Sequence, residues 1–196
     1  MTVKDVIIEA AYLVGEDEFA VALSGDGVTA DDGNAAAGAL DEEKYAAFIR
    51  CYNLTLHETA IDYLPIRKTV NTVGGKTEFS SLGFSVLRVE GVYDKDGAEL
   101  PYKVFPTHIV TPLTDVTIVF AVLPPDCAAD DGFAYDKTRV SKNIFALGAL
   151  GVASEYCFLN GRYTEADNFA KKFRAAVNVA PTLRGGRMKP AKRWGL

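Results

Sequence analysis

The chain has 196 residues, of which 48% are hydrophobic, and a formal net charge of −5. This length supports one hydrophobic core with room for a small second one. Because no run of about 18 apolar residues is present, we expect no membrane span, and the N-terminus lacks the basic and apolar segments of a signal peptide.

The charge is unevenly distributed along the chain. From Arg184 to Leu196 there are five basic residues and no acidic one. Without these five positive charges, the net charge of −5 becomes about −10 for the first 183 residues. The sequence therefore predicts an acidic body with a basic tail.

The three cysteines, Cys51, Cys127 and Cys157, form no CxxC pair. Cys51 and Cys157 fall within helical patterns, so we expect buried, reduced thiols rather than a disulfide.

A short helix is predicted at the N-terminus. Thr2 and Asp5 have the spacing of a capping box, with Asp in place of the usual Glu. The helix should end near Gly15. Its apolar face is expected to comprise Val3, Val6, Ile7, Ala10, Leu13 and Val14.

Small and acidic residues dominate the next stretch, Glu16–Leu40, which contains Gly25, Gly27 and Gly33. We expect a long exposed loop here, of the functional or mobile kind. Its glycines match neither GxGxxG nor the P-loop pattern, and its aspartates lack EF-hand spacing. A solvated loop is therefore favoured over a nucleotide or calcium site.

A long central helix is predicted over Asp41–Leu64, capped by Asp41 and ended by Pro65. Two sets of apolar residues recur at helical spacing, and a helix that is apolar on two sides is normally surrounded by neighbours. The first set is Tyr45, Phe48, Ile49, Tyr52, Leu56, Ala60 and Tyr63, and the second is Ala47, Cys51, Leu54, Ile61 and Leu64.

A β region follows from about Thr69 to Leu123. Gly74-Gly75 separates two short strand patterns and indicates a hairpin. The stretch Val116–Leu123 is nearly all apolar and is predicted to be the most buried strand. We expect about five antiparallel strands, with the Pro-flanked segments Leu100–Phe105 and His108–Thr111 at the edges.

Two closing helices are predicted after the β region. The first runs from about Thr138 to Leu159, and its Gly148 and Gly151 indicate close approach to the central helix. Its expected buried face is Val140, Ile144, Leu147, Gly151, Ser154 and Phe158. The second begins with a capping-box pattern at Thr164 and Asp167 and ends before Pro181. Its expected face is Ala166, Phe169, Ala170, Phe173 and Val177.

We find no pattern that predicts catalysis. His57 and His108 stand apart from other ligand types and are more typical of structural polar residues. No GxSxG elbow or Cys-His-Asn arrangement is present. We therefore expect no catalytic residue, no cofactor and no metal site, and a protein that is not an enzyme.

The basic tail is the one segment with a functional signature. It is either a solubilising end or an arm that docks on an acidic surface or a phosphate backbone, and the interleaved apolar residues favour an arm. The residues expected to bind a partner are Arg184, Arg187, Met188, Lys189, Lys192, Arg193, Trp194 and Leu196.

The order of these parts resembles the head-to-tail connector, or adaptor, proteins of tailed bacteriophages, the ring below the portal. The resemblance rests on TVKDVIIEAAYLVG, EEKYAAFIRCYNLTLHETAIDYLP, LRVEGVYDKDGAELPYKV and VTIVFAVLP, and extends over most of Val3–Val179. The Gly/Asp-rich loop departs from the family pattern, and no single residue can be carried over as a site.

The resemblance implies a virion structural protein in the neck between capsid and tail, assembled in the host cytoplasm. Its partners would be the portal protein, a tail or second neck protein, and itself in a ring that is usually dodecameric. Genomic DNA would pass through the ring without specific binding, and an acidic body suits such a channel because it repels DNA.

The expected fold is α+β. Residues 1–68 and 127–180 would form a helical body, 69–126 an inserted β subdomain, and 181–196 a flexible basic arm. Two other functions stay open: a tail-completion or tail protein of a phage, and a nucleic-acid-binding module that uses the basic arm.

Overall fold

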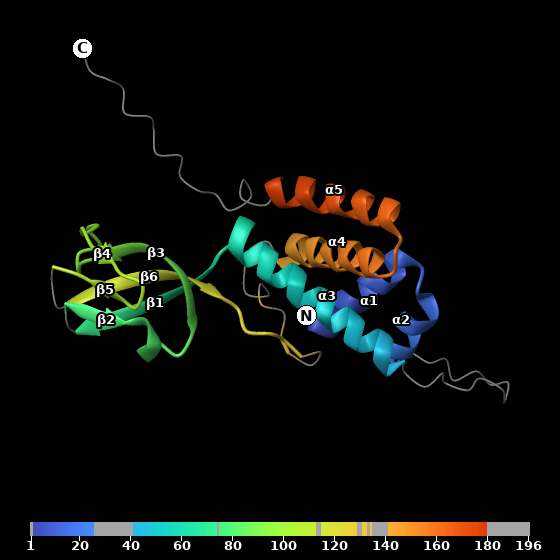
Figure 1. The fold of residues 1–196 in the computed structure, drawn as a ribbon, viewed down its shortest axis with the longest axis horizontal. Helices are drawn as coiled ribbons and strands as arrows, with labels where there is room; N and C mark the ends of the chain where they lie inside the picture. The colour runs from blue at the N-terminus through green and yellow to red at the C-terminus, as the bar shows by residue number, and fades with distance from the viewer. Residues whose placement is uncertain are drawn as a thin grey trace, which may run out of the picture. The chain divides into compact units, whose positions relative to one another are not determined.

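The computed structural model describes residues 2–25, 41–73, 75–112, 115–128, 131, 132, 134 and 141–179. The fold is α+β, as the sequence predicts (Figure 1). The chain divides into two compact units. The described parts of 1–55 and 127–196 form the helical unit, and 56–126 form the β unit. The β unit ends where expected, but it begins at Leu56 rather than at Thr69.

The first helix, α1 (Val3–Val14), confirms its predicted boundaries and cap. The Thr2 side chain accepts from the Asp5 N–H, and the Asp5 carboxylate accepts from the Thr2 N–H at 2.7 Å. Gly15 ends the helix in the left-handed conformation, with φ 79°. One predicted core position is wrong, because Leu13 is exposed while Ala11 is buried.

The expected loop over Glu16–Leu40 is wrong in its first part, which forms helix α2 (Asp17–Ser24). Acids in the first turn of α2 and a left-handed Gly25 at its end favour this helix. Phe19, Ala20 and Leu23 are buried, since their three- and four-residue spacing places them on one face. Residues 26–40 lie outside the described part of the chain.

The central helical stretch has nearly its predicted extent, but its last turn is not α-helical. Helix α3 covers Glu42–Glu58, and a π-helical turn over Thr59–Tyr63 follows it. Asp41 caps α3 as expected, since its carboxylate accepts from the Lys44 N–H at 3.0 Å. The first predicted face holds at Phe48, Tyr52, Leu56 and Ala60, which are buried. The second holds at Cys51 and Leu64, which are buried, but not at Leu54 and Ile61, which are exposed.

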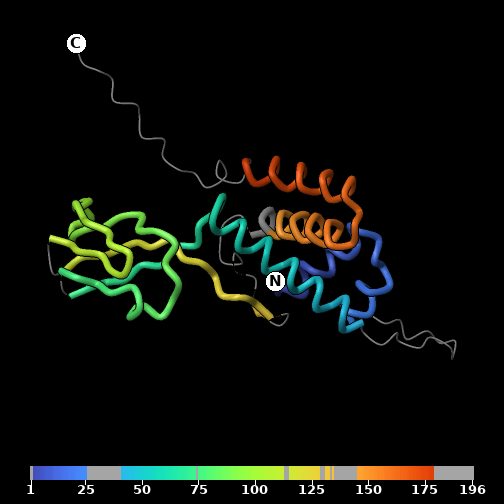
Figure 2. Tube along the Cα trace, viewed as in Figure 1, coloured from blue at the N-terminus to red at the C-terminus, as the bar shows by residue number. Residues whose placement is uncertain are grey.

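Helices α4 (Ser141–Leu159) and α5 (Tyr163–Val179) close the helical unit, and Figure 2 shows them lying side by side. Helix α4 is buried on most sides. Helix α5 buries only one stripe, and Figure 1 shows it at the outside of the helices. The buried residues of the pair are Leu147, Ala149, Val152, Ala153, Tyr156, Cys157, Ala166, Phe173 and Val177.

Gly151 allows α4 to approach α3 closely, as the sequence predicts. A β-carbon at this position would lie 2.3 Å from Cγ2 of Thr55 and 3.3 Å from a ring carbon of Phe173. Because real β-carbons do not come this close to other atoms, any larger residue forces the helices apart or changes a rotamer.

We expect Gly151→Ala to lower the free energy of unfolding by about 1–2 kcal/mol. Overpacking costs about 1–3 kcal/mol, and the higher helix propensity of Ala returns up to about 1 kcal/mol. Denaturant unfolding measures the change. Thr55→Ser is the matched control, because it removes Cγ2, and in the double variant it should recover part of the loss. Additive effects of the two substitutions would contradict the contact.

The β unit contains six described strands in two antiparallel sheets rather than one sheet of about five strands. The first sheet has the order β1-β6-β3, with β1 at Ile66–Val73, β6 at Asp115–Leu123 and β3 at Ser85–Tyr93. The second has the order β2-β5-β4, with β2 at Lys76–Glu78, β5 at His108–Val110 and β4 at Lys103–Val104.

Two strand predictions are wrong. The strands on either side of Gly74-Gly75 do not pair as a hairpin, because β1 pairs with β6 and β2 pairs with β5. Strand β5 is central in its sheet rather than at an edge. Strand β6 is the central and most buried strand, as predicted, and contributes Val116, Ile118, Phe120 and Val122 to a core shared with Val92 and Ile109. Because Ile109 belongs to the second sheet, both sheets close over this core.

None of the helices in the described part of the chain combines the length and the apolar character needed to cross a bilayer.

Candidate functional site

The turn between α4 and α5 forms the corner on which the candidate site is built. Gly161 adopts a left-handed conformation with φ 74°, and its N–H donates to the Phe158 carbonyl at 3.1 Å. The Arg162 N–H donates to the Cys157 carbonyl at 2.9 Å, so the last carbonyls of α4 are satisfied. Asn160 and Gly161 thus end α4, and the chain reverses direction before α5 begins at Tyr163.

The predicted capping box at Thr164 and Asp167 is wrong. Helix α5 begins at Tyr163, so Thr164 already lies inside the first turn. Asp167 pairs instead with Lys171 at 2.5 Å, one turn further along the helix.

Arg162 fixes this corner to the end of α1. Its Nη1 donates to the Val14 carbonyl at 2.9 Å, and its Nε donates to Glu165 at 3.0 Å. The hydrogen bond to Arg162 lowers the pKa of the Glu165 carboxyl below its usual range. Two segments that are distant in sequence, the end of α1 and the α4–α5 turn, therefore meet at the Arg162 side chain.

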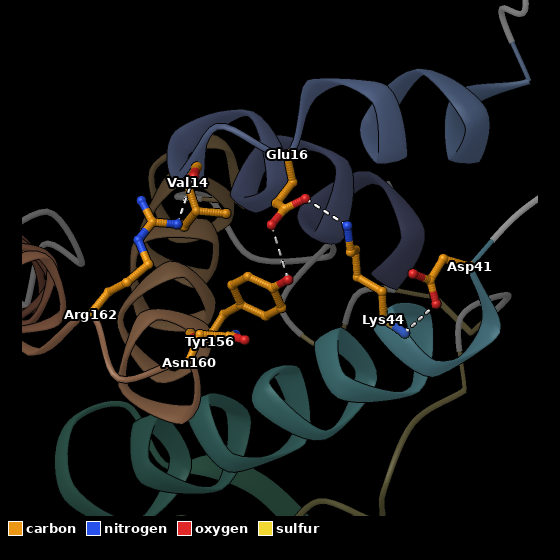
Figure 3. Close-up of polar contacts among 7 residues, drawn as sticks. All are labelled: Val14, Glu16, Asp41, Lys44, Tyr156, Asn160 and Arg162. Carbon is orange, nitrogen blue, oxygen red and sulfur yellow. Dashed lines mark hydrogen bonds and ion pairs between the residues drawn. The ribbon is translucent and has the colours of Figure 1, made fainter. Parts of the chain in front are cut away.

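Two further polar contacts form at Glu16, two residues after Val14. The Tyr156 hydroxyl donates to one carboxylate oxygen of Glu16 at 3.2 Å, and the Lys44 ammonium donates to the other at 2.7 Å (Figure 3). Burial, followed by the nearby Glu16 charge, raises the pKa of Tyr156 to about 12. The same carboxylate raises the pKa of Lys44 through their hydrogen bond. Glu16 thus ties the α1–α2 junction to α3 and α4.

An aromatic stack involves the same tyrosine, Tyr156. Phe48 lies between Phe19 and Tyr156, with ring centroids 5.2 Å and 4.1 Å apart and planes within 8° of parallel. All three side chains are buried. The stack therefore packs α2, α3 and α4 against one another.

The outer surface of the corner carries exposed apolar side chains. Phe158, Leu159 and Tyr163 are 59%, 50% and 64% exposed. The rings of Phe158 and Tyr163 meet edge to face, with centroids 5.5 Å apart. We refer to these three residues as the corner residues. Adjacent exposed apolar residues of this size are typical of protein interaction sites.

A groove between α4 and α5 continues from the corner residues. Its volume is about 370 Å³. It is lined by Ser154, Glu155, Phe158, Tyr163, Ala166, Asp167, Ala170 and Arg174. We call it the α4–α5 groove. Its small alanines, aromatic end and two carboxylates suit contact with another polypeptide segment rather than a chemical reaction.

The prediction that Phe158 belongs to the buried face of α4 is wrong. The other named residues of that face that the structure describes, Leu147, Gly151 and Ser154, are buried or half-buried. The exposure of Phe158 was not foreseen because α4 is apolar on nearly all sides, so its spacing does not reveal which side faces solvent.

The two histidines contact nearby backbone and side chains. Nε2 of His57 lies 3.1 Å from the Pro124 carbonyl and 3.3 Å from Asp126. The ring of His108 stacks on Phe105 with centroids 4.7 Å apart. No group of three or more His, Cys, Asp or Glu side chains in the described part of the chain is arranged to hold a metal ion.

The cysteine prediction is confirmed for the two helical thiols. Cys51 and Cys157 are free and buried, and burial raises the pKa of Cys51 to about 12. The Cys127 thiol is outside any disulfide as well, and this residue is half-buried.

All partner-binding residues predicted from the sequence lie outside the described residues. These are Arg184, Arg187, Met188, Lys189, Lys192, Arg193, Trp194 and Leu196. The corner residues and the α4–α5 groove, which sequence patterns did not single out, are the candidate site that the described structure offers.

Comparison with known proteins gives no further assignment: no protein-family model matches the chain, and no curated protein is found to be similar to it.

Proposed function

We propose that the protein is a head-to-tail connector of a tailed bacteriophage, a ring that joins the capsid portal to the tail. Its partners would be copies of itself, the portal protein and a tail or second neck protein. The genome would pass through the ring without specific binding.

The observation that carries the proposal is the exposed apolar corner on the helical unit. The corner residues are more than half exposed on average although the chain has the composition to bury them. Contacts between copies in a ring would cover such a surface, and apolar side chains at the centre of an interface contribute much of its energy.

Two further features support the proposal. The architecture of a helical unit with an inserted β unit agrees with the order of parts in the connector family. In addition, the first 183 residues carry about −10 of net charge, and negative charge on a channel wall repels DNA and lets it slide.

A double substitution, Phe158→Ser with Leu159→Ser, tests the proposal. Both side chains are exposed, so the melting temperature should change little. We expect the wild-type chain to form rings when mixed with portal protein and the variant to remain unassembled. Native mass spectrometry and electron microscopy measure the ring. Leu54→Ser, at another exposed leucine on α3 with 48% exposure, is the matched control and should assemble normally.

Ring formation by the double variant at the wild-type level would contradict the assignment of this surface. Binding of the wild-type chain to duplex DNA, with affinity falling steeply as salt rises, would favour a nucleic-acid-binding module instead.

A further inference from the structure

We propose that, in the unassembled protein, the C-terminal arm Leu183–Leu196 of the same chain binds in its own α4–α5 groove, with Trp194 against Phe158 and Tyr163. Three observations support this occupant: the length of chain that follows α5, the shape of the groove, and the charges on the two sides.

The arm is long enough to turn back along α5. Tyr163 and Val179 are the first and last residues of α5, and sixteen residues at about 1.5 Å each separate them by about 24 Å. Gly185-Gly186 allows a reversal of direction, because glycine adopts turn conformations without steric cost. The fifteen residues from Val179 to Trp194 span up to about 50 Å when extended. The arm is therefore long enough to return along α5 and place Trp194 beside Tyr163.

The groove has the size and surface that an indole ring needs. Its volume of about 370 Å³ lies within the range of about 300–1,000 Å³ that is typical of pockets for compact ligands. Ala166 and Ala170 leave space between the helices, and the edge-to-face pair of Phe158 and Tyr163 offers an aromatic end. Aromatic pairs favour such geometries, so Trp194 adds to an existing cluster.

The charges also favour this arrangement. The arm has five basic residues and no acidic one, and Lys192 and Arg193 immediately precede Trp194. Glu155 lines the groove and forms no ion pair within the described part of the chain. Asp167 also lines it, although it already pairs with Lys171, and Arg174 opposes the arm at the other end. Attraction is thus concentrated near the position expected for Lys192 and Arg193.

The tether favours the arm of the same chain over that of a second copy. A segment joined by a short flexible linker has an effective concentration in the millimolar range. At micromolar protein, an identical arm on another molecule competes poorly.

The role of this contact rests on the proposed function. A docked arm covers Phe158 and Tyr163, which that function assigns to contacts between copies. Transfer of the arm to the portal would uncover the corner, so ring assembly would follow portal binding rather than precede it.

Fluorescence of the full-length chain tests the docking directly, because Trp194 is the only tryptophan. We expect wild-type emission to be shifted to shorter wavelength, and acrylamide quenching to be weaker, than in a synthetic Leu183–Leu196 peptide. Phe158→Ala and Tyr163→Ala should each lower the ratio of docked to free arm about tenfold and move both readouts towards the peptide values. Tyr12→Ala is the matched control, at an α1 aromatic that is 46% exposed and does not line the groove.

High salt should weaken the protection of Trp194, since the carboxylates and the basic arm attract each other. The proposal is overturned by wild-type quenching equal to that of the peptide, or by protection that the two groove variants leave unchanged. It is also overturned by protection that rises with protein concentration, because the occupant is then the arm of a second copy.

These readouts require neither portal nor ring, so the two proposals can fail separately. If Trp194 is protected from quenching but the chain never joins a portal, the docking is supported and the proposed function is contradicted. If the chain joins a portal although Trp194 is quenched as strongly as in the peptide, the docking is ruled out and the proposed function stands.

Discussion

Phe48→Ala is expected to lower the free energy of unfolding by about 3–5 kcal/mol. Phe48 is fully buried and stacks on Phe19 on one side and on Tyr156 on the other. Its removal leaves a cavity and breaks two aromatic contacts, each worth about 0.5–1.5 kcal/mol beyond simple burial. Because a domain of this size has a total stability of about 5–15 kcal/mol, the helical unit should approach its folding threshold.

Chemical denaturation monitored by circular dichroism measures this loss. Leu54→Ala on the same helix is the control, since Leu54 is exposed and should change the stability by about 0.5 kcal/mol or less. A loss below about 1 kcal/mol for Phe48→Ala would mean that the centre of the helical core lies elsewhere.

Removal of Leu183–Leu196 is expected to abolish attachment to portal-containing capsids. The described helices end at Val179, so the truncated chain should keep nearly the wild-type melting temperature. The arm has five positive charges and one tryptophan. On the proposed function, the charges would steer it towards an acidic portal surface and the tryptophan would anchor it in an apolar pocket. Trp194→Ala alone should weaken attachment about 30-fold or more, as expected for a residue that dominates an interface.

A charge-neutral arm separates steering from anchoring. When the five basic residues are changed to Gln and Trp194 is kept, the association rate should fall and lose its salt dependence while dissociation changes less. Co-sedimentation with capsids measures attachment.

If the truncated chain completes heads at the wild-type yield, the arm is only a solubilising tail.

Local signals in the sequence predict the helices of this fold well. The Thr2–Asp5 capping box, the Gly15 end of α1 and the Asp41 cap of α3 all depend on residues within a few positions, and all three are confirmed. Helix α2 escaped prediction because it is short and lies in a stretch dominated by small and acidic residues, where its three buried side chains give a weak periodicity.

Strand pairing could not be predicted in the same way, because it depends on contacts between distant segments. Gly75 accepts from the Thr111 N–H at 2.7 Å, so the chain at this point continues into the second sheet instead of returning along β1. The apolar character of β6 predicts its central place, but not that β1 and β3 are its neighbours.

The candidate site and the polar contacts near it were the least predictable parts of the molecule. Glu16, Lys44 and Tyr156 come together from three separate segments, and no local spacing relates them. The exposure of the corner residues could not be predicted for a different reason. An apolar residue on a largely buried helix is expected to be buried, and only the packing of the helices shows that Phe158 is exposed.

The proposal of a connector is tested most directly by electron microscopy of the purified chain incubated with DNA-filled capsids of a tailed bacteriophage that carry the portal it is proposed to bind. We expect a ring of bound protein at the single portal vertex and none on the rest of the shell. We also expect the ring to be lost with the Phe158→Ser and Leu159→Ser double variant. A capsid with an unoccupied portal vertex, together with salt-sensitive binding of the chain to free duplex DNA, would contradict the assignment.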